Sequence, residues 1–329
     1  MHIIIYSVRP HDLQTLLPRL EQAGHIISSR AQRLEAATLD AAAGCDAVCT
    51  FVCDDVSAPV LQGLCERGVR LLLQRGAGVD NIDLDAARQL GIAVARVPAY
   101  SPHAVAEHAV ALLLALNRHI PQAYQRMQHA DFSLDGLLGF DLYGKTVGVI
   151  GMGRIGQCFA RIMLGFGCRV LAYDPAVTQD QRMPGVTYES LAAVWAASDV
   201  LSLHCPLRAE TQHLVNAALL AHTRPNALLI NTSRGAVVDT AAVLAALRSG
   251  SLRGYAADVY EGEACVFFRN CSDCGYDDSL LDALLHEPRV LLTPHQAFFT
   301  EEALANIATT TLDNVGTFLA GQRNANFVD

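Results

Sequence analysis

The feature that most constrains the fold is a glycine-rich turn between a strand pattern and a helix pattern. Residues 147–150 are apolar, and Gly151-Met-Gly153-Arg-Ile-Gly156 follows them directly and leads into a helical run. In this setting Gly151 permits a tight turn, Gly153 lets the backbone approach a pyrophosphate, and Gly156 lets the helix pack against the strand. The sequence therefore predicts a dinucleotide-binding turn at the start of a parallel α/β unit.

A carboxylate follows at the distance that such a site needs. Asp174 lies 18 residues beyond Gly156, directly after the apolar run 169–173. A carboxylate there can bind the ribose hydroxyls of adenosine and repels the extra phosphate of NADP. The sequence therefore predicts NAD as the cofactor. The alternative is an ordinary strand-to-helix turn, with Asp174 as a turn residue.

A second glycine motif nearby does not predict nucleotide hydrolysis. Residues 139–146 match the pattern G-x-x-x-x-G-K-[ST]. A phosphate-binding loop has to follow a strand and open a helix, whereas Lys145 and Thr146 lead into a strand. We therefore interpret the match as coincidental.

The rest of the chain alternates short β-branched runs with Ala- and Leu-rich helical runs, which is typical of parallel sheets covered by helices. Residues 1–98 predict one α/β unit, and a second unit begins at Lys145. Two prolines break the pattern between them, and one long helix, 103–127, capped by Ser101, is expected to cross between the units. The last helix, 301–319, has no strand partner and is expected to return to the first unit.

Composition and charge exclude several classes of function. The chain has 329 residues, 51% of them hydrophobic, which is enough for two cores. Its net charge of −9 argues against nucleic-acid and anionic-membrane partners. The longest strongly apolar run, 109–116, is far shorter than the ~20 residues that cross a membrane. The N-terminus lacks a signal-peptide pattern, so we expect a cytoplasmic protein whose ten cysteines are reduced thiols.

Three polar side chains follow apolar runs of the second unit. They are Arg234, Glu263 and His295. The carboxyl ends of parallel strands share one edge of a sheet, where ligands bind. An arginine, a carboxylate and a histidine supply the carbonyl clamp, the tuning group and the proton donor that reduction of a 2-oxo acid requires. Each residue alone could instead be a surface ion pair, a loop acid or a structural histidine.

These motifs resemble those of the D-isomer-specific 2-hydroxyacid dehydrogenase family in order and spacing, over the whole chain. The motifs that carry the resemblance are Ser233-Arg234-Gly235, Asp258-Val259-Tyr260-Glu261 with Glu263, and Pro294-His295. The resemblance implies an α/β protein of two doubly wound parallel-sheet domains. A Rossmann dinucleotide-binding domain, 100–296, would be inserted into a flavodoxin-like substrate domain formed by 1–99 and 297–329.

The resemblance also implies roles for individual residues. Arg234 would bind the carboxylate and carbonyl of the substrate, His295 would be the acid/base, and Glu263 would pair with His295. Imidazolium suits the proton transfer because its ordinary pKa, ~6.5, lies near working pH. Further substrate contacts are expected at Ala77, Gly78, Tyr100 and Phe298. Contacts to NAD are expected at Gly151, Gly153, Arg154, Ile155, Gly156, Asp174, Cys205, Pro206, Thr232, Ser233 and Asp258.

The implied activity is the reversible, NADH-dependent reduction of pyruvate to the D-2-hydroxy acid by hydride transfer. Glyoxylate, hydroxypyruvate or phenylpyruvate remain alternative substrates, because the fold and the three residues do not define the substrate side chain. A non-catalytic NAD-sensing regulator is a further alternative. We expect a homodimer or homotetramer, because the helix 103–127 carries more apolar surface than one domain can cover.

One loop departs from the family pattern. Cys265, Cys271 and Cys274 lie close together in it, with His286 downstream as a possible fourth zinc ligand. Structural zinc sites usually combine two paired clips of Cys or His, and only one is present here. We therefore expect no metal, and interpret the cysteines as exposed thiols near the active site.

Overall fold

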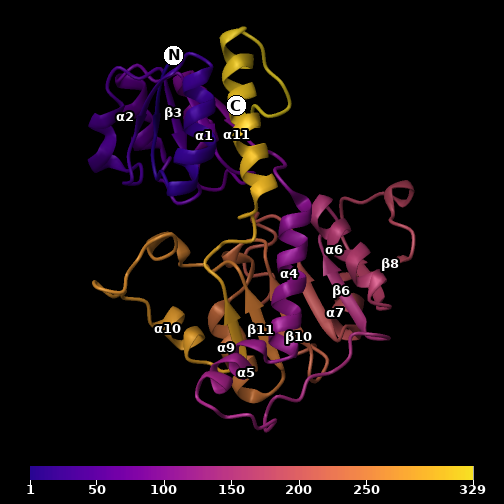
Figure 1. The fold of residues 1–329 in the computed structure, drawn as a ribbon. Coiled ribbons are helices and arrows are strands. Elements are labelled where there is room, and N and C mark those ends of the chain that lie inside the picture. The colour runs from indigo at the N-terminus through magenta and orange to yellow at the C-terminus, as the bar shows by residue number, and fades with distance from the viewer. Residues whose placement is uncertain (329) are drawn as a thin grey trace. The chain divides into compact units, whose positions relative to one another are not determined.

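The structure is a computed structural model that describes residues 1–328, apart from the side chain of Cys265. The chain divides into two compact units, drawn in Figure 1. Unit 1 comprises Met1–Ser101 and Phe298–Asp329, and unit 2 comprises Pro102–Ala297. The boundaries expected from the sequence lie two residues and one residue away from these.

Unit 1 contains a five-stranded parallel sheet in the order β2-β1-β3-β4-β5, which is the flavodoxin-like order. Its strands are β1 (His2–Ile5), β2 (Ile26–Ser29), β3 (Ala47–Thr50), β4 (Leu71–Gln74) and β5 (Ala93–Arg96). Its helices are α1 (Pro10–Gln22), η1 (Ala36–Ala42), α2 (Ala58–Glu66), α3 (Leu84–Leu90) and α11 (Glu301–Leu319). The strands are buried on both faces, as their nearly continuous apolar sequences require.

The two faces of this sheet are covered by segments from opposite ends of the chain. Ile4 points into a cluster with residues of α2 and α3, whereas Ile3 and Ile5 point into a cluster with α1 and α11. Helix α11 lies beside α1 in Figure 1, and Arg19 Nη1 of α1 donates a hydrogen bond to Ala305 O of α11 at 3.0 Å. The C-terminal segment therefore completes the core of the N-terminal unit.

Unit 2 contains a seven-stranded parallel sheet in the order β12-β11-β10-β9-β6-β7-β8. Its strands are β6 (Thr146–Ile150), β7 (Arg169–Tyr173), β8 (Val186–Tyr188), β9 (Val200–Leu203), β10 (Leu228–Asn231), β11 (Gly254–Ala257) and β12 (Val290–Leu292). The chain begins the sheet at β6, builds outward through β7 and β8, and returns to the other side of β6 with β9. This is the doubly wound dinucleotide-binding order, with its switch point between β6 and β9. The fold class predicted from the sequence is confirmed.

Helices cover both faces of the sheet of unit 2. The helical segments are α4 (Pro102–Asn117), α5 (Ile120–Gln128), α6 (Arg154–Gly165), η2 (Gln179–Gln181), α7 (Leu191–Ala197), α8 (Ala217–Leu220), η3 (Gly235–Val237), α9 (Thr240–Ser249), η4 (Glu263–Cys265) and α10 (Ser279–Leu285). Phe159 of α6 is fully buried in the cluster on one face, and Trp195 of α7 is fully buried in the cluster on the other. These two cores hold the carboxyl ends of the strands in a fixed order.

The structure corrects three expectations. The helix expected over 103–127 is two helices, α4 and α5, because His119 adopts a left-handed conformation with φ 52° and Pro121 restricts the preceding residue. Strands β2 and β8 were not predicted. Both are edge strands whose side chains are partly exposed, so they lack the continuous apolar run of a central strand. Within residues 1–328, no helix is long and apolar enough to cross a membrane.

Candidate active site

The glycine-rich turn joins β6 to α6 at the carboxyl edge of the sheet of unit 2. Gly151 has φ 97°, and a Cβ atom added there would lie 2.6 Å from the backbone nitrogen of Cys205. A Cβ on Gly156 would lie 2.0 Å from Gly151 O, so helix and strand approach too closely for any side chain. At Gly153 an added Cβ would meet nothing within 4 Å. Each glycine therefore has the geometry of its predicted role, and the first turn of α6 opens onto free space.

Two polar groups beside this turn fit a dinucleotide. Asp174 Oδ2 accepts a hydrogen bond from Met152 N at 2.7 Å, which places the carboxylate against the glycine-rich turn. Thr232 Oγ1, after β10, is buried and has no hydrogen-bond partner in the described part of the chain. A buried hydroxyl without a partner needs one, and a bound cofactor would supply it. The residues present therefore fit NAD.

The other residues expected to bind the cofactor also lie at this edge. Arg154 and Ile155 begin α6, and Cys205 and Pro206 follow β9. Burial raises the pKa of the Cys205 thiol to about 11. Ser233 Oγ donates to Asn231 Oδ1 at 2.8 Å, so its hydroxyl already holds the turn after β10. The contacts of these residues with NAD remain predictions.

Asp258, after β11, holds the segment that carries the histidine. Its carboxylate is buried, and Oδ1 accepts hydrogen bonds from Thr293 Oγ1 at 2.6 Å and from Gln296 N at 2.8 Å. Oδ2 accepts from Ala297 N at 2.8 Å. Asp258 thereby ties both ends of the 293–297 turn to β11. This positioning role was not predicted from the sequence, and the expected contact of Asp258 with NAD remains a prediction.

His295 and Glu263 form a close pair. His295 Nδ1 lies 2.7 Å from Glu263 Oε1, and Glu263 Oε2 accepts a hydrogen bond from Tyr260 N at 2.8 Å. A carboxylate only accepts, so Nδ1 carries the hydrogen and the tautomer is determined. Nε2 is thus the nitrogen that can exchange a proton with a substrate. The structure therefore brings together the acid/base and the carboxylate that the sequence analysis paired.

Arg234 is held next to the segment that carries Glu263. It lies between β10 and η3, and Asn231 Nδ2 donates to Arg234 O at 2.9 Å. A Cβ on the next residue, Gly235, would lie 2.0 Å from the carbonyl carbon of Tyr260. Only glycine allows this close crossing of the two backbones. The crossing explains why a glycine follows the arginine in the sequence.

In unit 1, the turn after β4 offers backbone donors. Ala77 O accepts a hydrogen bond from Arg96 Nη1 at 2.7 Å, and Gly78 O accepts one from Gln74 Nε2 at 3.2 Å. Among residues 1–328, no group accepts a hydrogen bond from the amides of Ala77 and Gly78. Because their carbonyls are held by the protein, these amides can bind an external anion such as a carboxylate. This arrangement fits the predicted substrate contacts at both residues.

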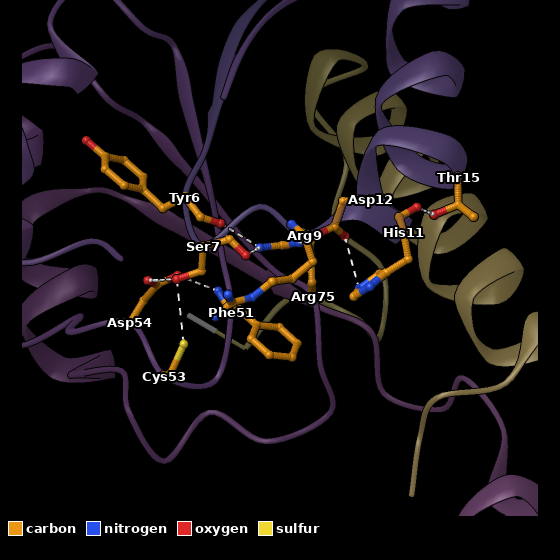
Figure 2. Close-up of polar contacts among 10 residues, drawn as sticks. All are labelled: Tyr6, Ser7, Arg9, His11, Asp12, Thr15, Phe51, Cys53, Asp54 and Arg75. Carbon is orange, nitrogen blue, oxygen red and sulfur yellow. Dashed lines mark hydrogen bonds and ion pairs between the residues drawn. The ribbon is translucent and has the colours of Figure 1, made fainter. Parts of the chain in front are cut away.

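A buried ion pair supports this turn from behind, as Figure 2 shows. Arg75 Nη1 lies 2.5 Å from Asp12 Oδ2 at the start of α1, and its guanidinium lies 5.3 Å from the centre of the Phe51 ring. Burial opposes the charge of Arg75, but the Asp12 carboxylate outweighs it, so the pKa of Arg75 rises. Asp54 accepts hydrogen bonds from Ser7 Oγ at 2.7 Å and Phe51 N at 2.6 Å, and burial raises its pKa. The cluster joins α1 to the carboxyl ends of three strands.

The two aromatic residues expected to contact substrate lie together in unit 1. The rings of Tyr100 and Phe298 are 6.3 Å apart, and Phe298 also lies 5.9 Å from the ring of Phe51. Asn306 Nδ2 donates to Tyr100 O at 2.7 Å, which attaches this segment to α11. Phe51 was not singled out from the sequence, because its place beside Phe298 depends on packing between distant segments.

The cysteine loop shows no sign of a zinc site. In the described residues, no three His, Cys, Asp or Glu side chains form a group that could hold a metal. Cys271 is partly exposed and Cys274 is exposed, while the side chain of Cys265 lies outside the description. His286 Nδ1 lies 2.8 Å from Asp282 O of its own helix. The absence of a metal remains a prediction.

Replacing Glu263 with glutamine should shift the pH profile of 2-oxo acid reduction towards acid. The carboxylate favours the imidazolium form of His295, and the neutral amide removes that stabilisation. At pH 8 we expect kcat to fall on the order of tenfold, with a smaller loss at pH 6. Initial rates across pH measure the shift. Glu261→Gln is the matched control, because Glu261 pairs with His213 instead. An unshifted profile in Glu263→Gln would refute the pairing.

Comparison with known proteins agrees with this site. A family model described as D-isomer specific 2-hydroxyacid dehydrogenase, NAD binding domain, matches residues 110–297. The D-lactate dehydrogenase of Escherichia coli strain K12 is 44% identical over 322 residues, covering 98% of each chain. The apo-structure of D-lactate dehydrogenase from Escherichia coli has a TM-score of 0.89 at 42% identity and full coverage of both chains. D-lactate dehydrogenase from Aquifex aeolicus, complexed with NAD and lactic acid, has a TM-score of 0.89 at 32% identity, covering 99% and 98%.

Proposed function

Because this chain belongs to the D-isomer specific 2-hydroxyacid dehydrogenase family, and is an NAD-dependent enzyme of that family, we propose that it is a D-lactate dehydrogenase. It would reduce pyruvate with NADH to D-lactate, reversibly. The observation that carries the proposal is the His295–Glu263 pair at 2.7 Å, with Arg234 held at the same sheet edge. The names of the relatives and the apolar ring cluster of Phe51 and Phe298 support a substrate with a small apolar group.

The residues of this chain account for the steps other than hydride transfer, which NADH supplies when bound at the glycine-rich turn. The planar fork of Arg234 binds the substrate carboxylate and polarises the carbonyl oxygen. His295 Nε2 donates the proton that the developing alkoxide takes up. Glu263 stabilises the imidazolium and holds the ring in one orientation. In unit 1, the amides of Ala77 and Gly78 offer further donors for a carboxylate.

Initial rates of NADH oxidation with a panel of 2-oxo acids test this function. We expect pyruvate to have a higher kcat/KM than glyoxylate, hydroxypyruvate or phenylpyruvate, and only D-lactate to reduce NAD in the reverse direction. A preference for another acid would retain the catalytic residues and change the substrate. Tight NADH binding without any turnover would favour a regulatory protein on this fold.

We also propose that the enzyme is a homo-oligomer, a dimer or a tetramer. The apolar residues of α4 are mostly buried, whereas α5 and the segment after it expose large apolar side chains. These exposed side chains are Ile120, Tyr124, Met127, Phe132, Leu134, Leu138 and Tyr143. A segment this apolar is typical of a surface that a second subunit covers. The supporting surface is thus α5 and its continuation rather than the whole of 103–127.

Replacing Leu134 and Leu138 together with glutamate should dissociate this oligomer. Both side chains are more than 80% exposed in the single chain, so the charges should not disturb its core. Each buried leucine contributes about 2 kcal/mol, so the dissociation constant should rise more than about a hundredfold. Sedimentation velocity measures the change in mass. Leu13→Glu, an exposed leucine of α1, is the control, and an unchanged mass of the double variant would contradict the proposed interface.

We further propose that the enzyme works in the cytoplasm, without nucleic-acid or membrane partners. Nine cysteines, all but Cys265, are free thiols, and the net charge is −9. Free thiols persist in reducing compartments, and an acidic protein is repelled by phosphates. Both observations support this location.

A further inference from the structure

The loop between β11 and α10 is closed at its base and carries residues of the active site. Tyr260 Oη donates to the Asp278 carboxylate at 2.9 Å, and Asp278 also caps α10 by accepting from Leu281 N at 2.9 Å. The first half of the loop contains Glu263 and Phe268, whose ring lies 5.6 Å from that of His295. The second half makes no contribution to the proposed chemistry, although it contains two thiols.

Cys271 and Cys274 lie three residues apart on one turn of this second half. Gly275 N donates to Cys271 O at 2.8 Å, which closes a single helix-like turn around the two residues. The preceding Asn270 Oδ1 accepts from Ser272 N at 3.0 Å and fixes the start of the turn. Residues three apart on such a turn have Cβ atoms about 5–6 Å apart, and a disulfide needs about 3.5–4.5 Å. An approach of about 1–2 Å would therefore join the two sulfur atoms.

These two thiols differ from the other described cysteines in access to solvent. Cys274 is exposed and Cys271 is partly exposed. The five buried cysteines are Cys45, Cys49, Cys158, Cys168 and Cys205. Two more, Cys53 and Cys65, are partly buried and bond to Ser7 Oγ and to Leu90 O. Within residues 1–328, with Cys265 set aside, the turn is thus the place where two accessible thiols are neighbours in the sequence.

We propose that Cys271 and Cys274 form a redox-active dithiol that a low-molecular-weight disulfide converts into a disulfide within the loop. The more exposed Cys274 attacks first, as a thiolate, and forms a mixed disulfide while the first thiol of the co-reactant leaves. Cys271 then attacks the Cys274 sulfur and releases the second thiol. Two electrons pass from the cysteines to the co-reactant, and the two protons end on the two released thiols. The second step is favoured because it is intramolecular.

The proposal is independent of the proposed function, because neither cysteine touches the residues assigned to the substrate or to NAD. Serine variants of either should keep pyruvate reductase activity within about twofold, since exposed substitutions rarely change stability much. Failure of the redox proposal would therefore leave the dehydrogenase assignment unaffected, and the reverse also holds.

Peptide mass measurement on the full-length protein tests the proposal. The reduced protein is equilibrated with graded ratios of reduced to oxidised glutathione, alkylated and digested with trypsin. Cleavage after Arg269 and Arg289 yields a peptide, 270–289, whose only cysteines are Cys271 and Cys274. We expect this peptide to lose two hydrogen atoms and its alkyl groups as the oxidised form increases. A peptide that stays doubly alkylated at every ratio, or one linked to the preceding peptide that carries Cys265, would overturn the proposal.

Single variants test the order of the two steps. Cys271→Ser should stop at the mixed disulfide and accumulate glutathione on Cys274. Cys274→Ser should acquire glutathione at least about fivefold more slowly, because Cys271 is less exposed. Cys65→Ser is the matched control and should form the loop disulfide like the unmodified protein. Faster modification of Cys274→Ser than of Cys271→Ser would overturn the assignment of Cys274 as the attacking thiol.

Discussion

His295→Asn should lower kcat for pyruvate reduction by about 10²- to 10⁴-fold while NADH affinity stays within about twofold. Asparagine removes the proton donor but tolerates the left-handed backbone that His295 adopts, with φ 54°. It therefore tests the chemistry of the side chain without adding backbone strain. Steady-state rates give kcat, and the quenching of protein fluorescence by NADH gives the dissociation constant.

The chain offers a matched control for this variant. His213 also has a left-handed backbone, with φ 48°, and also pairs with a glutamate, since its Nε2 lies 3.0 Å from Glu261 Oε2. His213→Asn should therefore keep kcat within about twofold if only His295 serves as the acid/base. Equal losses in the two variants would show that the His295 effect is structural. A His295→Asn protein that keeps more than a tenth of kcat would contradict the assigned role.

Arg234→Lys should lower kcat/KM for pyruvate by about 10²- to 10³-fold. Lysine keeps the positive charge but replaces a planar fork of donors by a single ammonium, which cannot bind the carboxylate and the carbonyl oxygen together. The loss should appear in kcat as well as in KM, because polarisation of the carbonyl strengthens in the transition state. Initial rates over a range of pyruvate concentrations separate the two parameters.

Arg248→Lys is the control for this variant, because Arg248 lies on α9 with an exposed side chain and is assigned no role. NADH affinity should be the same in both variants and in the unmodified protein. If Arg234→Lys kept more than a tenth of kcat/KM, charge alone would explain the role of Arg234, and the fork geometry would be unnecessary.

Much of the fold was predictable because it depends on local patterns. The glycine-rich turn, the apolar central strands and the helix α11 follow from residues adjacent in sequence. The break between α4 and α5 was missed even though Pro121 is visible in the sequence, because the apolar pattern continues past it. Strands β2 and β8 were missed because an edge strand is partly exposed and gains its hydrogen bonds from one neighbour only.

The candidate site divides in a similar way. Arg234, Glu263 and His295 could be selected from the sequence because each is a chemically distinctive residue after a predicted strand of a parallel sheet. The supporting contacts could not. Asp258 was expected at the cofactor, but the hydrogen bonds that it accepts from the 293–297 turn depend on the pairing of β11 with β12. The ion pair between Arg75 and Asp12 joins residues 63 positions apart.

By itself the sequence determined the class of fold, the family and the residue types that do the chemistry, because periodicity, glycine placement and motif spacing are local properties of the chain. Tertiary structure alone decided how those residues are held. The 2.7 Å contact of His295 with Glu263, the glycine crossing beside Arg234 and the open amides of Ala77 and Gly78 each require segments distant in sequence to meet at defined distances. Packing of the sheet cores determines those distances, and no local pattern encodes them.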